Sequence, residues 1–106
     1  MSIPEITVQD LKKLLDTKAS VMILDVRNSD EYAICNLGGH LLPLSELPTR
    51  LHELNPEQQI IIHCHAGGRS RRATEFLIKE GFKNVANLKG GITAWANEID
   101  PTMAKY

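Results

Sequence analysis

The chain is poor in several features that define whole classes of protein. It holds only two cysteines, Cys35 and Cys64, so it has neither a disulfide scaffold nor the paired cysteines of a structural zinc site. No apolar run approaches the length of a membrane span, and the first residues lack the basic-then-apolar pattern of a secretory signal. Its net charge of -1 offers no excess of basic residues to a nucleic acid or a membrane surface. We therefore expect a cytoplasmic protein that binds neither of these, with both cysteines as free thiols.

What the sequence does contain is an alternation of short apolar runs with amphipathic segments. The 106 residues suffice for one domain, residues 1–106, that buries roughly two thirds of its unfolded surface. Strands alternating with helices predict an α/β fold, with a mostly parallel five-stranded sheet and helices on both faces. The expected strands lie at residues 3–6, 21–24, 41–42, 60–62 and 85–88, and the expected helical segments at residues 8–15, 31–33, 46–54, 70–80 and 92–99.

Residues 59–72 carry the clearest chemical signal. The isoleucine run at 60–62 is typical of a central strand buried on both faces, and the apolar signal stops at Cys64. A helical pattern begins at Ser70, so Cys64 opens a tight loop between the end of a strand and the start of a helix. Free N–H groups and the helix dipole favour negative charge there, which lowers the pKa of a thiol. We expect Cys64 to be a nucleophilic thiolate near neutral pH.

The loop that follows Cys64 fits the binding of an anion. Gly67 and Gly68 allow positive φ, so that successive backbone N–H groups can face the sulfur as a nest. Three arginines, at positions 69, 71 and 72, would crowd a helix N-terminus unfavourably unless an anion lies nearby. A lone cysteine after an apolar strand is more often a packing residue, but packing alone would not require two glycines and an arginine directly after it.

The two histidines beside Cys64 are not expected to form a metal site with it. Alternation along an extended segment sends His63 and His65 to the side opposite Cys64. We interpret His63 as a structural residue, and His65 as a residue on the rim of the loop with a weak role in substrate binding.

Further polar and glycine-rich segments follow other predicted strands. In a parallel sheet, ligands bind beyond the carboxyl ends of the strands, where Asp25, Arg27 and the glycine pairs at 38–39 and 90–91 are expected to gather. The opposite charges of Asp25 and Arg27 favour an internal ion pair over direct catalysis, which gives both residues a supporting role. Trp95 is expected to pack in the core.

Four motifs together resemble the rhodanese-like sulfurtransferase domain, along the whole chain. They are Leu24-Asp25-Val26-Arg27, Glu31-Tyr32, Cys64-His65-Ala66-Gly67-Gly68-Arg69-Ser70 and Asn87-Leu88-Lys89-Gly90-Gly91-Ile92-Thr93-Ala94-Trp95. The resemblance implies a thiosulfate sulfurtransferase in which the catalytic Cys64 takes the outer sulfur of an anionic donor as a persulfide. A thiol, cyanide or a sulfur-carrier protein would then accept that sulfur, with no metal or organic cofactor. The loop would bind substrate and persulfide through His65, Ala66, Gly67, Gly68, Arg69 and Ser70, with Arg69 attracting the donor.

Two details refine this resemblance. The segment from Trp95 to Tyr106 is similar to the rhodanese domain fused behind adenylating enzymes that activate ubiquitin-like sulfur carriers; here that domain stands alone or was cut out. Cys35-Asn36 stands where many family members have Gly-His, a change that the fused branch tolerates. Cys35 is therefore interpreted as a packing residue, with a resolving thiol as the alternative.

Other functions compete with this interpretation. A cysteine phosphatase or an arsenate reductase also has a His-Cys pair, an anion-binding loop and an arginine, but five residues separate its cysteine from its arginine. Here four residues separate Cys64 from Arg69, and Ser70 occupies the place of the phosphatase arginine. A persulfide carrier or docking module that delivers sulfur to a partner protein would use the same loop. A catalytically inactive regulatory domain is disfavoured because the loop retains Cys64 and Arg69.

Overall fold

The structure, a computed structural model, describes residues 2–106 and contains one five-stranded sheet. Its order is β1-β5-β4-β2-β3, and each pair of neighbouring strands is parallel. This arrangement confirms the predicted α/β fold with a parallel sheet. The strands are β1 (Glu5–Ile6), β2 (Val21–Asp25), β3 (His40–Leu41), β4 (Gln59–His63) and β5 (Val85–Leu88).

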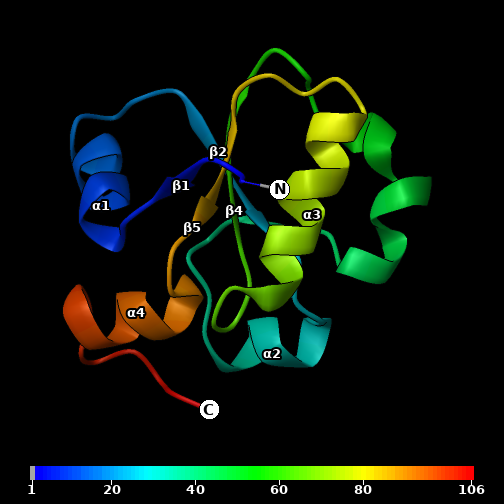
Figure 1. Ribbon diagram of the computed structural model, residues 1–106. Helices are drawn as coiled ribbons and strands as arrows, with labels where there is room; N and C mark the ends of the chain where they lie inside the picture. The colour runs from blue at the N-terminus through cyan, green and yellow to red at the C-terminus, as the bar shows by residue number, and fades with distance from the viewer. Residues whose placement is uncertain (1) are drawn as a thin grey trace.

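Helices cover both faces of the sheet (Figure 1). Two of them pack together on one face, α1 (Val8–Asp16) and α4 (Gly91–Glu98). The other face carries α3 (Gly68–Lys79) and two 3-10 helices, η1 (Leu44–Thr49) and η2 (Leu51–Glu53). The short α2 (Ser29–Ile34) follows β2 near the lower edge of the sheet in Figure 1. Within residues 2–106, no helix has the length and apolar character needed to cross a membrane.

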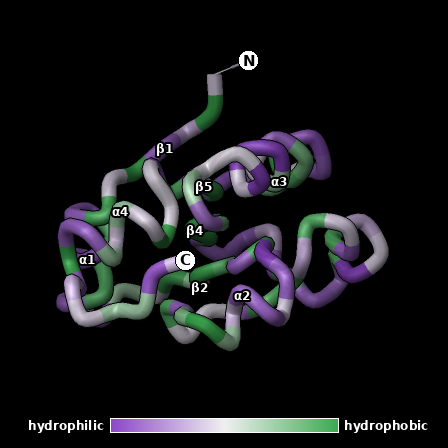
Figure 2. The backbone as a smooth tube through the Cα atoms, turned by 90° about the horizontal axis from the view of Figure 1, so that it is seen from below, coloured by the Kyte–Doolittle hydropathy of each residue, from purple (hydrophilic) through white to green (hydrophobic). Residues whose placement is uncertain are grey.

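The central strand β4 separates two hydrophobic cores. Ile60 and Ile62 belong to the core beneath α3, whereas Ile61 belongs to the core beneath α1 and α4, which also contains Trp95. Because each face of β4 is covered, the isoleucine run needs no polar alternation. Viewed from below, in Figure 2, β2 and β4 are hydrophobic in the middle of the molecule. Cys64 continues the alternation and lies in the α3 core.

The structure corrects four predicted elements, and one of them is β1, which was expected at residues 3–6 but covers only residues 5–6. The segment expected as a helix at 46–54 forms η1 and η2 instead, because Pro48 removes a backbone donor from the middle of the segment. Helix α3 begins at Gly68, two residues earlier than expected, because the positive φ of Gly67 (129°) already turns the chain into the helix. Strand β3 covers residues 40–41 rather than 41–42.

The carboxyl ends of the strands meet at the lower edge of the sheet in Figure 1. Cys64 follows β4 there, Arg27 follows β2, and α4 begins there after β5. The chain beyond α4 returns along the same edge towards α2, where the Tyr106 hydroxyl contacts Glu31. Segments far apart in the sequence therefore surround the end of β4, where ligands bind in a parallel sheet. The Gly38-Gly39 pair was expected there too, but Gly39 lies against the backbone of Ile23 in the middle of β2.

Candidate active site

Cys64 is the first residue after β4, and its side chain is buried, with 2% of the residue exposed. The loop of residues 64–67 folds back over it, and the Gly67 N–H donates a hydrogen bond to the Cys64 sulfur at 3.2 Å. The positive φ of Gly67 (129°) makes this approach available at low cost, because a side chain would strain such a backbone. Gly67 therefore takes the positive φ expected of both glycines, whereas Gly68 does not and is the first residue of α3.

The pKa of Cys64 lies below the ordinary value of a thiol. Burial acts to raise the pKa, but hydrogen bonds from the Ser70 hydroxyl and from the N–H groups of Ser70, Gly67 and Arg69 stabilise the thiolate more strongly. These donors lie in the first turn of α3 or just before it, where backbone N–H groups have no partner inside the helix. The loop thus stabilises negative charge on a sulfur atom that is shielded from water.

Ser70 links this loop to the two strands at one edge of the sheet, β5 and β1. Its buried hydroxyl lies 2.6 Å from Asn87 Oδ1 in β5 and can give its single hydrogen either to that oxygen or to the Cys64 sulfur, and Asn87 Nδ2 donates to Glu5 Oε2 in β1 at 3.1 Å. A buried polar chain with satisfied partners fixes the position of each member. Strands β5 and β1 therefore position the hydroxyl that faces Cys64, and Asn87 is a supporting residue to which the sequence reasoning assigned no role.

The first turn of α4 holds the other side of the loop. Ile92 N–H donates to the Cys64 carbonyl at 3.1 Å, and both the N–H and the hydroxyl of Thr93 donate to the His65 carbonyl at 3.0 Å. Gly91 permits this contact: a Cβ built there would lie 2.5 Å from the His65 oxygen and 2.8 Å from the Cys64 oxygen. The Gly90-Gly91 pair, expected near the sheet edge, lets α4 approach the loop backbone.

Asp25 and Arg27 form a fully buried ion pair, with 2.7 Å between Arg27 Nη2 and Asp25 Oδ2. Arg27 Nη2 also donates to the Cys35 carbonyl at 2.8 Å, so the pair fixes the segment between β2 and β3. A buried charge pair of this kind keeps its stability only while each partner retains its hydrogen bonds. The internal ion pair that the charge pattern predicted is thus present in the structure.

The two histidines have different environments. His63 is fully buried, and its Nε2 lies 3.6 Å from Asp25 Oδ2 without a hydrogen-bond partner among residues 2–106. Burial lowers the pKa of His63, which keeps the ring neutral. His65 lies half-buried at the loop rim and stacks on the Tyr106 ring, with 4.1 Å between centroids and 14° between planes. No group of three potential ligands among His, Cys, Asp and Glu gathers in residues 2–106 to hold a metal ion.

The guanidinium group of Arg69 has a partner, Glu31, that the sequence alone does not predict. Its Nη1 and Nη2 donate to the two carboxylate oxygens of Glu31 at 2.6 and 2.8 Å. The Tyr106 hydroxyl donates to Glu31 Oε2 at 2.7 Å and accepts a hydrogen bond from Arg27 Nη1 at 3.0 Å. Glu31 is 38 residues from Arg69 and Tyr106 is 75 residues from Glu31, so no local spacing signals these contacts.

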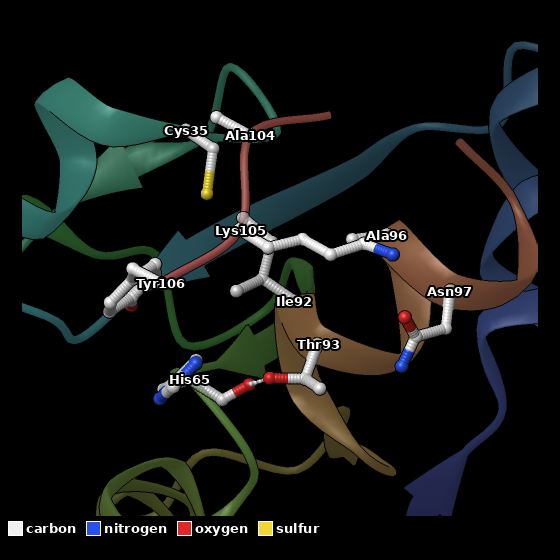
Figure 3. A pocket seen from close by; sticks show the side chains of 9 residues that line it. All are labelled: Cys35, His65, Ile92, Thr93, Ala96, Asn97, Ala104, Lys105 and Tyr106. Atoms are coloured by element: carbon white, nitrogen blue, oxygen red, sulfur yellow. Dashed lines mark hydrogen bonds between the residues drawn. The ribbon is translucent and has the colours of Figure 1, made fainter. Parts of the chain in front are cut away.

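A cavity of about 260 Å³ lies beside His65 (Figure 3). The half-buried Cys35 extends its sulfur towards this space from above, and Lys105 crosses over it. Cys35 and Cys64 are both free thiols. The cavity lies between α4 and the C-terminal segment, and its lining residues are Cys35, His65, Ile92, Thr93, Ala96, Asn97, Ala104, Lys105 and Tyr106.

Comparison with known proteins agrees with this architecture. Residues 7–98 match the family described as the rhodanese-like domain. The chain belongs to this family. A protein described as a sulfurtransferase from Allochromatium vinosum is 34% identical over 101 residues, which cover 94% of each chain. The putative sulfur carrier protein YrkF of Bacillus subtilis is 39% identical over 100 residues, 93% of this chain and 54% of that protein, so this rhodanese-like chain spans about half of its length.

A solved structure shows the same rhodanese-like fold. The crystal structure of a rhodanese-like domain protein from Staphylococcus aureus superposes with a TM-score of 0.83 at 32% identity, covering 92% of this chain and 95% of that one. Because the coverage is nearly complete in both directions, the two chains share the same overall fold.

Proposed function

We propose that the protein is a sulfurtransferase that carries a sulfane sulfur as a persulfide on Cys64. The observation that carries the proposal is the buried Cys64 sulfur, whose pKa is lowered by hydrogen bonds from the surrounding loop. A buried thiolate with several N–H donors provides both a nucleophile and a binding site for the charge of its persulfide product. The names of the related proteins from A. vinosum and B. subtilis support the same class of chemistry.

The proposed reaction has two halves. The Cys64 thiolate attacks the outer sulfur of thiosulfate, the sulfur–sulfur bond of the donor breaks, and sulfite leaves with the bonding electrons. The outer sulfur stays on Cys64 as a persulfide anion, towards which the N–H groups of the loop are directed. A thiolate, cyanide or a sulfur-carrier protein then attacks this outer sulfur, and the Cys64 thiolate returns. These two half-reactions use no metal or organic cofactor. A reducing compartment such as the cytoplasm would keep the thiols reduced and available for them.

A carrier that delivers sulfur to a partner protein is the second candidate function. It is favoured by the name of YrkF and by the 32% identity over 118 residues to an adenylyltransferase and sulfurtransferase from Arabidopsis thaliana, of which the chain covers 25%. Such a carrier would form the same persulfide but turn over small acceptors slowly. Measuring sulfur transfer from loaded Cys64 to cyanide and to a candidate carrier protein separates the two functions.

The spacing of the loop argues against phosphatase chemistry. Four residues lie between Cys64 and Arg69, and the guanidinium group of Arg69 turns to Glu31 rather than over the sulfur as a phosphate ligand would require. Comparing the hydrolysis of a phosphate ester with sulfur transfer from thiosulfate would expose an error in this assignment.

The test is to incubate the reduced protein with thiosulfate and to record its intact mass. We expect a gain of one sulfur atom that cyanide reverses. Cys64→Ser should abolish the gain, whereas the matched variant Cys35→Ser should retain most of it, because the hydrogen bonds of the loop surround only the Cys64 sulfur. A gain that depends on Cys35 instead would refute the assignment.

A further inference from the structure

The Glu31 carboxylate binds the guanidinium group of Arg69. Both Nη atoms of the guanidinium group donate to Glu31, at 2.6 and 2.8 Å, in a two-pronged ion pair. The pair lies at the mouth of the loop, with 33% of the Arg69 side chain and 15% of the Glu31 side chain exposed. A sulfonate group that approaches Cys64 can therefore use these two donors only by displacing Glu31.

Glu31 is itself held in place by other contacts. Its Oε1 accepts the Asn28 N–H at 3.3 Å, which closes the capping box of α2, and its Oε2 accepts the Tyr106 hydroxyl at 2.7 Å. Hydrogen bonds from Arg69 lower the pKa of Glu31 to about 2, with burial opposing them. The carboxylate is therefore charged throughout the neutral range, and moving it would break several hydrogen bonds at once.

The charge of this ion pair acts on the reacting sulfur. The Arg69 N–H belongs to the loop that stabilises the Cys64 thiolate. Hydrogen bonds to Glu31 raise the pKa of Arg69, and the Cys64 charge adds to this effect despite burial. Arg27, the next cation along this edge, is already balanced by Asp25. A donor that approaches Cys64 therefore meets an arginine whose charge Glu31 has neutralised.

We propose that Glu31 is a specificity-determining residue that lowers the use of doubly charged sulfur donors relative to singly charged ones. This inference rests on the proposed persulfide function. By balancing the charge of Arg69, Glu31 weakens the electrostatic attraction of the site for any anionic donor. The attraction energy that is lost doubles when the charge of the donor doubles. Glu31 acts through Arg69 and is not a catalytic residue.

Two small donors that differ by one charge provide the probe. Thiosulfate carries two negative charges, and its sulfur transfer to the Cys64 thiolate releases sulfite. Methanethiosulfonate carries one negative charge: the thiolate attacks its terminal sulfur, the sulfur–sulfur bond breaks, and methanesulfinate leaves with the electron pair. Both reactions leave the same Cys64 persulfide anion, so the ratio of their kcat/KM values isolates the donor.

The experiment compares this ratio, thiosulfate over methanethiosulfonate, in the wild-type protein, in Glu31→Gln and in Glu46→Gln. Glutamine keeps the size of Glu31 and an oxygen that can accept from Asn28 or Tyr106, while the positive charge of Arg69 is no longer balanced. We expect Glu31→Gln to raise the ratio roughly fivefold at low ionic strength and to approach the wild-type ratio at about 1 M salt. Glu46→Gln removes a carboxylate of η1 that pairs with Arg50, and should leave the ratio unchanged.

Each outcome decides a separate point. A general loss of structure would lower both kcat/KM values together and leave their ratio at the wild-type value, which would overturn the role of Glu31. A raised ratio that persists at high salt would also overturn it, because charge would not be the cause. Failure of both donors to load Cys64 in all three proteins would overturn the proposed function itself.

Discussion

Replacing Gly91 with alanine should separate the active-site loop from the helix that holds it. Gly91 has a φ of 60°, and an added Cβ would lie 2.5 Å from the His65 carbonyl oxygen and 2.8 Å from that of Cys64. Backbone oxygens cannot rotate away like the end of a long side chain. The loop and the first turn of α4 must therefore move apart, which weakens the hydrogen bonds from Ile92 and Thr93 to these two carbonyls.

The expected loss of stability follows from these contacts. A left-handed backbone costs an alanine about 1 kcal/mol or slightly more relative to glycine. Each of the two weakened backbone hydrogen bonds adds about 1 kcal/mol. Together these effects predict that Gly91→Ala lowers the free energy of unfolding by about 3 kcal/mol, equivalent to a fall in Tm of roughly 12 °C or more for a domain of this size. The rate of persulfide formation should fall as well, because the loop that positions Cys64 moves.

Gly38→Ala is the matched control. Gly38 has a similar φ of 72°, but within the described residues 2–106 no heavy atom beyond its chain neighbours lies within 4 Å of the built Cβ. Gly38→Ala should lower the free energy of unfolding only by the cost of the left-handed backbone, about 1 kcal/mol, and should keep the rate of persulfide formation. Urea unfolding and stopped-flow loading with thiosulfate measure the two quantities. Equal losses of stability in both variants, or a normal loading rate in Gly91→Ala, would refute the claim that the contact between α4 and the loop positions Cys64.

Three further predictions concern charge at the site. Ser70→Ala should move the pH midpoint of Cys64 alkylation upward, because the thiolate loses the hydroxyl that lowers its pKa; an unmoved midpoint would contradict this role. Arg69→Ala should raise the KM for thiosulfate, because Glu31 is left as an uncompensated negative charge; an unchanged KM would exclude electrostatic influence of the pair. Glu31→Gln should be less stable than wild type in urea at pH 7. Because folding lowers the Glu31 pKa from 4.5 to about 2, this stabilisation is complete above about pH 4.5 and is lost as the pH falls towards 2; a difference that persists below pH 2 would contradict the linkage.

The sequence predicts most of the fold because local and global signals agree. The isoleucine run of β4 supplies apolar side chains to both cores. The amphipathic spacing of α1 and α3 places an apolar face of each helix against one core. The exception is residues 44–53, where leucines at helical spacing coincide with a proline. Spacing alone indicated a helix there, but Pro48 cannot donate in the middle of an α-helix, and the chain forms two 3-10 helices instead.

The candidate site is predictable only in its local part. Cys64 and its loop are adjacent in sequence, so a cysteine followed by two glycines and an arginine carries the chemical signal. The contacts of Glu31 and Tyr106 depend on how distant segments meet at the edge of the sheet, and single residues at such separations leave no periodic pattern. Asn87 stands in a motif quoted for the family resemblance, but its bond to Ser70 becomes visible only when β5 lies beside β4.

The attachment of α4 to the loop has a consequence for synthesis on the ribosome. The Cys64 thiol emerges before residues 91–93, which supply the donors to its own carbonyl and to that of His65. β5, which carries the partner of Ser70, is also translated after the cysteine. A nascent chain that stops short of these segments thus holds the Cys64 loop without the contacts from α4 and β5 that position it. The contacts that hold the active-site loop are therefore complete only once residue 93 has been translated.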